Sequence, residues 1–314
     1  MRNNNLSTIN EVVMSGKSKY IIHLSETLHE HNYSAIADEI ASRKSVRLVL
    51  IAGPSSSGKT TSAKRLALHM RISGLNPIIL GLDDYFKNRV DTPLDASGEY
   101  DFECLEALDV EFLNKQLTQL FAGEEIEIPR YNFAAGAREF DGEKLRMREN
   151  DILIMEGIHG LNPKLTGLIP ENRKFKIFVS VLTPLVIDNN NTMEAADYRL
   201  LRRMVRDNQF RNCTAEDTIL RWPSVRAGEE KYILPFKSEA TAEFNSALYY
   251  EMPMLKCYAE PLLQAIPKSS PTYGEALRLL EELRAIIAMT PVSVKNIPPT
   301  SIIREFIGGS SFSY

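Results

Sequence analysis

Cysteine is scarce in this sequence of 314 residues, and the three that occur, Cys104, Cys213 and Cys257, lie far apart. Their spacing forms neither a disulfide framework nor a Cys-x2-Cys metal site, so we expect reduced thiols. No apolar run approaches the ~20 residues that a membrane-spanning helix needs, and no signal-peptide core is visible. We therefore expect a soluble, cytoplasmic protein with no membrane partner.

Excess charge is also lacking. The 41 acidic residues nearly balance the 37 basic residues and leave a net charge of −4. The chain as a whole has no field that would attract nucleic acid, and we expect no nucleic-acid partner. Any phosphate binding must therefore depend on local groups. Hydrophobic residues make up 44% of the chain, which is enough for one large α/β domain with appendages or for two modest domains.

Residues 46–61 combine an apolar run with a glycine-rich segment. The run Val-Arg-Leu-Val-Leu-Ile-Ala is followed by Gly-Pro-Ser-Ser-Ser-Gly-Lys-Thr-Thr. This order predicts a strand, a phosphate loop and the start of a helix. Gly53 and Gly58 allow a tight turn whose N–H groups point inward. A polyphosphate would then lie at the N-terminus of the helix, where unpaired donors and the helix dipole favour anions.

Two residues of this motif have specific expected roles. Lys59 is placed to reach the β- and γ-phosphates, and the hydroxyl of Thr60 is placed to bind Mg²⁺. A glycine-rich turn that binds nothing is the alternative, which the flanking strand and helix disfavour. The remaining residues that we expect to bind the nucleotide are Gly53, Ser55, Ser56, Ser57, Gly58 and Thr61.

Two further apolar strands end in carboxylates. Segment 77–82 leads into Asp83 and Asp84, and segment 151–155 leads into Glu156. Open α/β sheets bind ligands at the carboxyl ends of their strands. We expect Glu156 to hold Mg²⁺ or its water, although a capping residue at a turn is the alternative. Asp83 is a better candidate than Asp84 to face the loop, because adjacent strand residues point to opposite sides.

A helix predicted near residues 194–207 carries a basic stripe. Positions 199, 202, 203 and 206 share one helix face, and Arg211 follows. A solvated surface is the ordinary interpretation of such a stripe. Beside a phosphate loop, however, guanidinium groups would neutralise the charge of a phosphoryl group in transfer.

The rest of the chain predicts the fold class. Helical spacing over residues 6–43 predicts two or three helices before the first strand, and residues 175–181 form a fourth core strand. The apolar cluster near the end of segment 291–314 suggests that this tail docks onto the molecule. We therefore predict an α/β fold, a parallel sheet of the P-loop NTPase type flanked by helices, with an N-terminal helical extension.

Over residues 45–240 the chain resembles the uridine kinase and phosphoribulokinase family of phosphate-loop kinases. The matching motifs are the loop from Gly53, the strand end at Asp83, Phe102-Glu103, Pro129-x-Tyr131-x-Phe133, Glu156-Gly157 and the arginine cluster. The helical lead-in and the ending Arg304–Gly309 resemble a bacterial subgroup of nucleoside kinases. Members of that subgroup often carry a domain similar to part of threonyl-tRNA synthetase, which is missing here, so we expect a kinase-only relative or a part of a longer chain.

The resemblance implies a kinase that uses ATP and Mg²⁺ and phosphorylates the 5′-hydroxyl of a ribonucleoside similar to uridine or cytidine. It implies that Asp83 is the base and that Glu103 binds the ribose hydroxyls. Lys59 and a mobile lid of arginines would act on the phosphates, and the implied lid residues are Arg203, Arg206 and Arg211. The residues expected to contact the nucleoside are Asp83, Glu103, Tyr131, Phe133 and Arg138.

The corresponding domains would be a helical extension over residues 1–44, a nucleoside kinase domain over residues 45–290 and a docking tail over residues 291–314. A small nucleoside is the expected partner, and a homo-oligomer is left open.

Two residues depart from the family pattern. Gly136 stands where uridine kinases place a histidine that reads the pyrimidine, and Asn132 stands where aspartate is expected. Gly136 would leave room for a larger base, so we expect base selectivity that is looser than, or different from, that of a uridine kinase.

Three alternative functions also involve a nucleotide-binding loop. A GTPase is disfavoured because Asn114–Leu117 lacks the final acid of the guanine motif. A regulatory or RNA-associated nucleotide-binding module is disfavoured because a pure binder does not need an acceptor-side base such as Asp83. A kinase for a different small hydroxyl substrate stays open.

Overall fold

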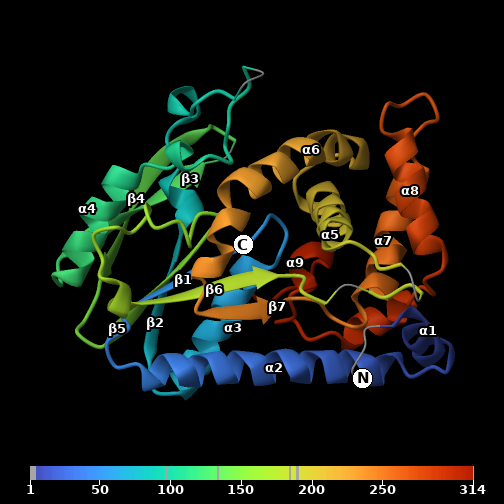
Figure 1. Ribbon diagram of the computed structural model, residues 1–314, viewed down its shortest axis with the longest axis horizontal. Coiled ribbons are helices and arrows are strands. Elements are labelled where there is room, and N and C mark those ends of the chain that lie inside the picture. The colour runs from blue at the N-terminus through green and yellow to red at the C-terminus, as the bar shows by residue number, and fades with distance from the viewer. Residues whose placement is uncertain (1–4, 96–97, 133, 184, 189–190, 314) are drawn as a thin grey trace.

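The computed structural model describes residues 5–95, 98–132, 134–183, 185–188 and 191–313. Its centre is a five-stranded, fully parallel sheet with the strand order β2-β5-β1-β6-β7 (Figure 1). The strands are β1 (Leu48–Ala52), β2 (Asn76–Gly81), β5 (Asp151–Glu156), β6 (Lys174–Ser180) and β7 (Ala242–Asn245). The predicted fold class, a parallel α/β sheet flanked by helices, is confirmed.

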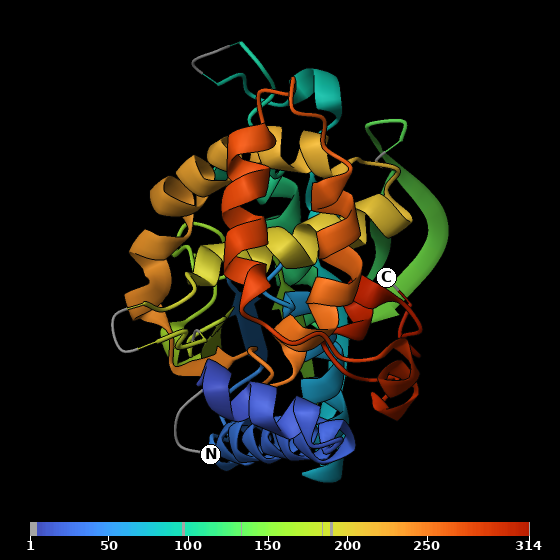
Figure 2. The ribbon, with the colours of Figure 1, turned by 90° about the vertical axis from the view of Figure 1, so that its right-hand side faces the viewer.

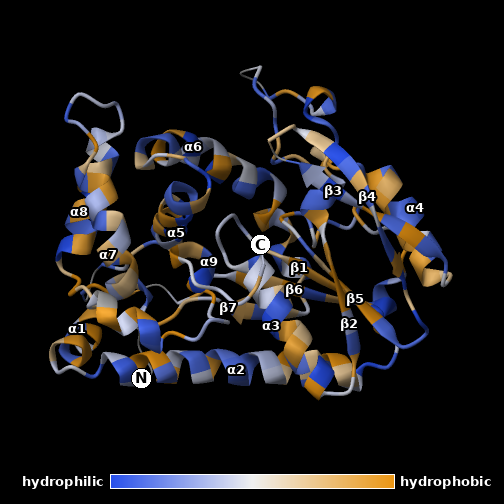
Figure 3. Ribbon diagram, turned by 180° about the vertical axis from the view of Figure 1, so that it is seen from behind, coloured by the Kyte–Doolittle hydropathy of each residue, from blue (hydrophilic) through white to orange (hydrophobic). Residues whose placement is uncertain are grey.

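Both faces of this sheet are covered by helices. Every residue of β1 is buried, as is usual for a central strand of a parallel sheet. One face packs against α2 (Ser18–Ser42) and α3 (Lys59–Ile72), and the other packs against α4 (Val110–Phe121). Figure 3 shows the apolar central strands between these more polar helices. The hydrophobic core thus fixes the position of the loop between β1 and α3.

An antiparallel hairpin stands beside α4. It consists of β3 (Glu125–Asn132) and β4 (Ala137–Arg146). The alternation of isoleucine and glutamate over residues 126–128 indicates a short strand, but nothing in the sequence indicates its partner β4. Most residues of β4 are half-buried or exposed, so the strand lacks the apolar alternation that would have revealed it.

The remaining helices form a bundle beside the sheet (Figures 1 and 2). Its main members share one apolar cluster. They are α1 (Leu6–Met14), α5 (Ala195–Phe210), α6 (Ala215–Tyr232), α7 (Glu251–Gln264) and α8 (Tyr273–Arg284). Short 3₁₀ helices occupy Leu82–Tyr85, Arg89–Asp91, Leu105–Ala107, Glu171–Arg173, Leu234–Glu239 and Pro291–Asn296. Within the described ranges, none of the helices is both long enough and apolar enough to cross a membrane.

The C-terminal segment returns to the sheet. Its short helix α9 (Arg304–Ile307) lies next to α5, and Ile302 and Phe306 are fully buried in the cluster that α2, α3 and the sheet form. This places residues 302–312 beside the start of α3.

Candidate active site

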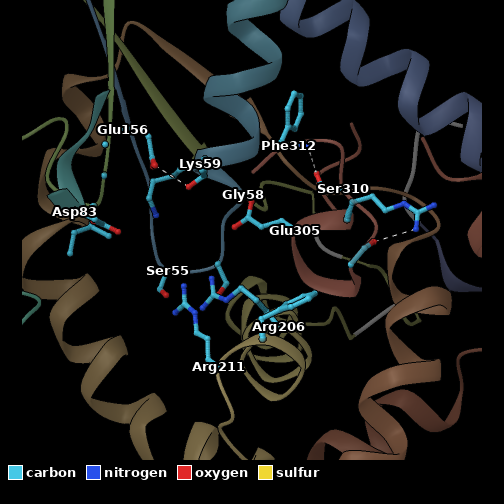
Figure 4. A pocket seen from close by; sticks show the side chains of 18 of the residues that line it. Ser55, Gly58, Lys59, Asp83, Glu156, Arg206, Arg211, Glu305, Ser310 and Phe312 are labelled. Atoms are coloured by element: carbon cyan, nitrogen blue, oxygen red, sulfur yellow. Dashed lines mark hydrogen bonds between the residues drawn. The ribbon is translucent and has the colours of Figure 1, made fainter. Parts of the chain in front are cut away.

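A cavity of about 720 Å³ lies at the carboxyl ends of β1, β2 and β5. Its walls come from four parts of the chain: the loop before α3, the ends of β2 and β5, the C-terminal end of α5 with Arg211, and the segment around and after α9 (Figure 4). The volume lies within the range of pockets that hold small ligands.

Close packing explains the two glycines of the loop. A Cβ atom on Gly53 would lie 2.0 Å from the carbonyl oxygen of Val179 on β6, so only glycine fits there. Gly58 has a φ of +88° and faces Ile302 of the C-terminal segment, whose Cγ2 would lie 2.7 Å from an added Cβ. Ser56 also adopts a left-handed φ, +58°. The loop is therefore held in a strained, open turn between β1 and α3.

Several groups of the loop suit a polyphosphate. Ser56 and Ser57 have buried hydroxyls with no hydrogen-bond partner among the described residues, which is costly unless a ligand supplies one. The Nζ of Lys59 donates to the carbonyl of Pro54 at 3.1 Å. Burial lowers the pKa of Lys59, while the carboxylates of Glu156 and Asp83 oppose that shift. The observed donors therefore fit an anionic ligand in this loop.

A cation would fit beside them. The hydroxyl of Thr60 donates to Oε1 of Glu156 at 2.9 Å, so the two expected metal-binding residues lie together. Burial and the nearby Asp83 raise the pKa of Glu156 to about 7, which shows that this position favours added positive charge. Three or more clustered His, Cys, Asp or Glu ligands are absent from the described residues. Magnesium held here would therefore take most of its ligands from phosphate oxygens and water.

Asp83 and Asp84 both line the cavity, but they differ in their contacts, and not for the predicted reason. They lie in the 3₁₀ helix after β2, not in a strand, so strand alternation was the wrong argument. Asp84 accepts from the backbone N–H of Tyr131 at 3.1 Å and from Arg130 at 3.3 Å. Asp83 faces the cavity opposite Lys59 and Glu156 (Figure 4). Enclosure by the cavity walls raises the pKa of Asp83, and Lys59 opposes the shift.

The basic stripe of α5 divides into two groups. Arg199 and Arg202 are buried in bidentate ion pairs with Glu229 and Glu251. Arg199 also donates to the carbonyl of Ser55 at 3.1 Å, and Arg202 donates to the next two loop carbonyls at 3.2 Å each. These two arginines therefore hold the outer side of the loop.

The three predicted lid arginines meet at one buried carboxylate. Asp207 is paired with Arg206 at 2.7 Å, with Arg203 at 3.3 Å and with Arg211 at 3.5 Å. Arg206 and Arg211 line the cavity, whereas Arg203 donates to the hydroxyl of Ser55 at 2.9 Å. Their positive charge is thus gathered at the mouth of the phosphate loop.

Of the residues expected to contact the nucleoside, Asp83 lines this cavity, whereas Glu103, Tyr131 and Arg138 do not. Glu103 packs against Gly228 of α6, and Tyr131 is buried with its ring 5.6 Å from that of Phe86. Arg138 is paired with Asp109 at 2.9 Å, and its guanidinium lies over Phe112. Phe133 falls outside the described residues.

The expected room beside Gly136 is not present, so that prediction was wrong. A Cβ on Gly136 would lie 2.7 Å from the guanidinium carbon of Arg89, and the N–H of Arg89 donates to the carbonyl of Gly136 at 2.8 Å. Arg89 therefore fills the space that the missing side chain leaves. The sequence offered no signal for this contact, because Arg89 lies in a 3₁₀ helix and Gly136 lies in the distant turn between β3 and β4.

The comparison with known families decides the general class of this site. The chain matches the sequence model of the Phosphoribulokinase / Uridine kinase family over residues 48–249. It belongs to that family. The resemblance seen in the sequence is thereby confirmed, and the protein is a phosphotransferase of the kinase type.

Individual relatives are distant. A curated uridine kinase of Staphylococcus aureus strain JH9 is 28% identical over 198 residues, which cover 63% of this chain and 86% of the relative. The solved D-glycerate 3-kinase from Cryptococcus neoformans is 13% identical with a TM-score of 0.42 and covers 65% of this chain and 88% of its own. The phosphoribulokinase from Rhodobacter spheroides is 18% identical with a TM-score of 0.37 over 62% and 68% of the two chains.

Proposed function

We propose that this protein transfers the γ-phosphoryl group of Mg·ATP to the 5′-hydroxyl of a ribonucleoside. The observation that carries the proposal is the meeting of the phosphate loop, Asp83 and two cavity-lining arginines at one cavity. Membership of the kinase family and a curated relative that is a uridine kinase support it.

The loop and its neighbours would position the donor. Backbone N–H groups at the start of α3 would bind the phosphates, and Lys59 would neutralise charge on the transferred group. Thr60 and Glu156 would hold magnesium, which supplies positive charge to the phosphates. Arg206 and Arg211 would leave Asp207 and close over the γ-phosphate when both substrates are bound, because such closure excludes water and limits hydrolysis.

Asp83 would act on the acceptor. The hydroxyl oxygen attacks the γ-phosphorus, the bond from that phosphorus to the oxygen bridging to ADP breaks, and the hydroxyl proton passes to the carboxylate of Asp83. Its raised pKa makes this carboxylate a stronger base than an ordinary aspartate. Glu103 would accept hydrogen bonds from the ribose hydroxyls. Its charge lies near that of Arg203, which in turn contacts Ser55 of the loop.

A second acceptor class is favoured by one observation. Because the guanidinium of Arg89 fills the space beside Gly136, the region that the family uses for the base is narrower than the sequence suggested. A smaller hydroxyl compound would fit such a region. A sugar or another small alcohol is therefore the alternative substrate.

The test is an acceptor panel with an Asp83→Asn variant. Purified protein and Mg·ATP are supplied with nucleosides, nucleoside monophosphates and sugars, and both ADP and the phosphorylated product are measured. We expect 5′-monophosphate from at least one ribonucleoside. Asp83→Asn should keep its ATP affinity and lose ~10²-fold or more in turnover, since general-base catalysis contributes about that much.

Asp38→Asn is the matched control, because Asp38 lies on α2, away from the cavity lining, and accepts a hydrogen bond from the hydroxyl of Ser73 at 2.8 Å. It should react at the parent rate. If Asp83→Asn lost as much ATP affinity as turnover, Asp83 would instead be a metal-binding or structural residue. Phosphorylation of sugars alone would replace the nucleoside assignment with the alternative.

A further inference from the structure

We propose that the C-terminal segment 302–312, together with Phe210 of α5, binds the base and ribose of the nucleoside triphosphate donor. This inference rests on the proposed function, because it assumes that the loop after β1 binds the triphosphate. The segment lies beyond residues 48–249, so the family match does not account for it. It nevertheless lines the same cavity as the loop, through six residues: Arg304, Glu305, Gly308, Gly309, Ser310 and Phe312.

The direction of the bound donor follows from the loop. Lys59 reaches the β- and γ-phosphates, so the acceptor meets the donor on the side of Asp83. The α-phosphate and the nucleoside must then extend past the start of α3. The C-terminal segment occupies that side: Ile302 packs on Gly58, and Glu305 accepts from the hydroxyl of Thr61 at 2.6 Å. Figure 4 shows Ser310 and Phe312 on the opposite side of the loop from Asp83.

Two aromatic rings are available at this end of the cavity. Phe210 is 55% exposed although it is a large apolar side chain, and it lines the cavity. It lies next to the C-terminal segment, because a Cβ on Gly308 would be 3.2 Å from its ring. Phe312 of the segment lines the cavity as well. A flat heteroaromatic base is the ligand that such rings bind by stacking.

The two glycines allow neighbouring side chains to pack closely against this wall. Gly308 and Gly309 have φ values of +86° and +73°, which favour glycine. A Cβ on Gly308 would lie 3.2 Å from the ring of Phe210, and a Cβ on Gly309 would lie 2.9 Å from a guanidinium nitrogen of Arg304. The glycines therefore let Phe210 and Arg304 lie against the segment that lines the cavity.

Hydrogen bonds hold the C-terminal segment in place. Arg304 donates to the carbonyls of Val294 and Ile297 at 2.7 Å each and to that of Gly308 at 3.3 Å. The N–H of Ser311 donates to the carbonyl of Pro299 at 3.0 Å, and Lys64 of α3 binds the carbonyl of Ser313. A wall held in this way loses little freedom when a ligand binds.

The experiment compares two probes that differ only in the nucleoside. Affinities for ATP and for inorganic tripolyphosphate are measured by calorimetry on the full chain and on the Phe210→Ala, Phe312→Ala and double variants. Each ring that stacks on the base should, when removed, weaken ATP binding roughly tenfold. Tripolyphosphate affinity should not change, because the loop is untouched. Tyr20→Ala is the matched control, since Tyr20 is 61% exposed on α2.

Phe312→Leu replaces Phe312→Ala if the latter does not fold, because leucine keeps apolar volume without a ring. Unchanged ATP affinity in a folded double variant would overturn the inference. An equal loss of affinity for ATP and for tripolyphosphate would also overturn it, because the segment would then only support the loop. If the parent binds ATP more tightly than tripolyphosphate but phosphorylates no nucleoside, the donor site stands and the acceptor assignment fails.

Discussion

Glu103 is a carboxylate whose surroundings destabilise its charged form. Burial raises the pKa of Glu103 to about 7, although the guanidinium of Arg203 opposes the shift. A carboxylate with a raised pKa stabilises the folded state only while it is protonated, so that contribution is present below pH 4.5 and is lost as the pH rises through 7. The free-energy cost of a charged carboxylate in such a place is typical of residues that bind a ligand and do not stabilise the fold.

Glu103→Gln should therefore stabilise the free protein at pH 8, by up to about 3 kcal/mol, because it removes the buried charge. The difference from the parent should shrink as the pH falls from 7 and vanish near pH 4.5. Denaturant unfolding at several pH values measures this. The variant should also bind a ribonucleoside more weakly, since an amide accepts the ribose hydroxyls less strongly than a carboxylate does.

Glu106→Gln is the control for this series, because Glu106 is an exposed carboxylate in the next 3₁₀ helix. It should leave the pH dependence of unfolding unchanged. A stability gain in Glu103→Gln that persisted at pH 4 would point to altered packing, and the interpretation from charge would then be wrong.

At the scale of elements, α5 is the part that holds the phosphate loop in place. Arg202 is completely buried, and it joins Glu251 of α7 to the carbonyls of Ser56 and Ser57. Its guanidinium also lies 5.2 Å from the ring centroid of Phe306 in α9. One side chain thus connects the loop with two other helices, and the shape of the loop depends on it.

Arg202→Met should lower the free energy of unfolding by about 3–5 kcal/mol, because Glu251 would be left as an unpaired buried charge. ATP affinity should fall as well, since two loop carbonyls lose their donor. The double variant Arg202→Met with Glu251→Leu separates these effects. It should regain much of the stability without regaining the affinity. A double variant that bound ATP like the parent would show that the loop does not need Arg202.

The same pair shows what could be predicted from the sequence. The strand, loop and helix at residues 46–61 and the acids at the carboxyl ends of β2 and β5 were predictable, because each depends on neighbours in the sequence. The partners of Arg199 and Arg202 were not, since Glu229 and Glu251 lie 30 and 49 residues further along the chain. Arg89 beside Gly136 and the C-terminal wall of the cavity are non-local in the same way.

Over the whole molecule, the N-terminal helix α2 joins the parts that form the cavity. Its buried Glu26 accepts from Tyr250 and from Ser301 at 2.6 Å each, and it lies 3.2 Å from Arg65 of α3. The ring of Tyr33 stacks on that of Phe244 in β7 with centroids 4.2 Å apart. From the sequence we predict that residues 1–44 form a helical extension of a kinase domain. In the structure, these contacts join α2 to the sheet, to α3 and to the C-terminal segment.

We therefore expect residues 45–314 alone not to reach a cooperative folded state. Each large apolar side chain that α2 buries contributes about 1.5–3 kcal/mol, and the fully buried ones include Ile21, Ile22 and Ile40. Together these approach the ~5–15 kcal/mol by which a domain is stable. Removal would also leave Arg65, which is 1% exposed, without its ion-pair partners Glu26 and Glu30.

Thermal unfolding followed by circular dichroism tests the truncated chain, and a separate peptide of residues 1–44 should restore the transition and ATP binding. A truncated chain that unfolds cooperatively near the midpoint of the full chain and binds ATP as tightly would show instead that α2 is a dispensable extension.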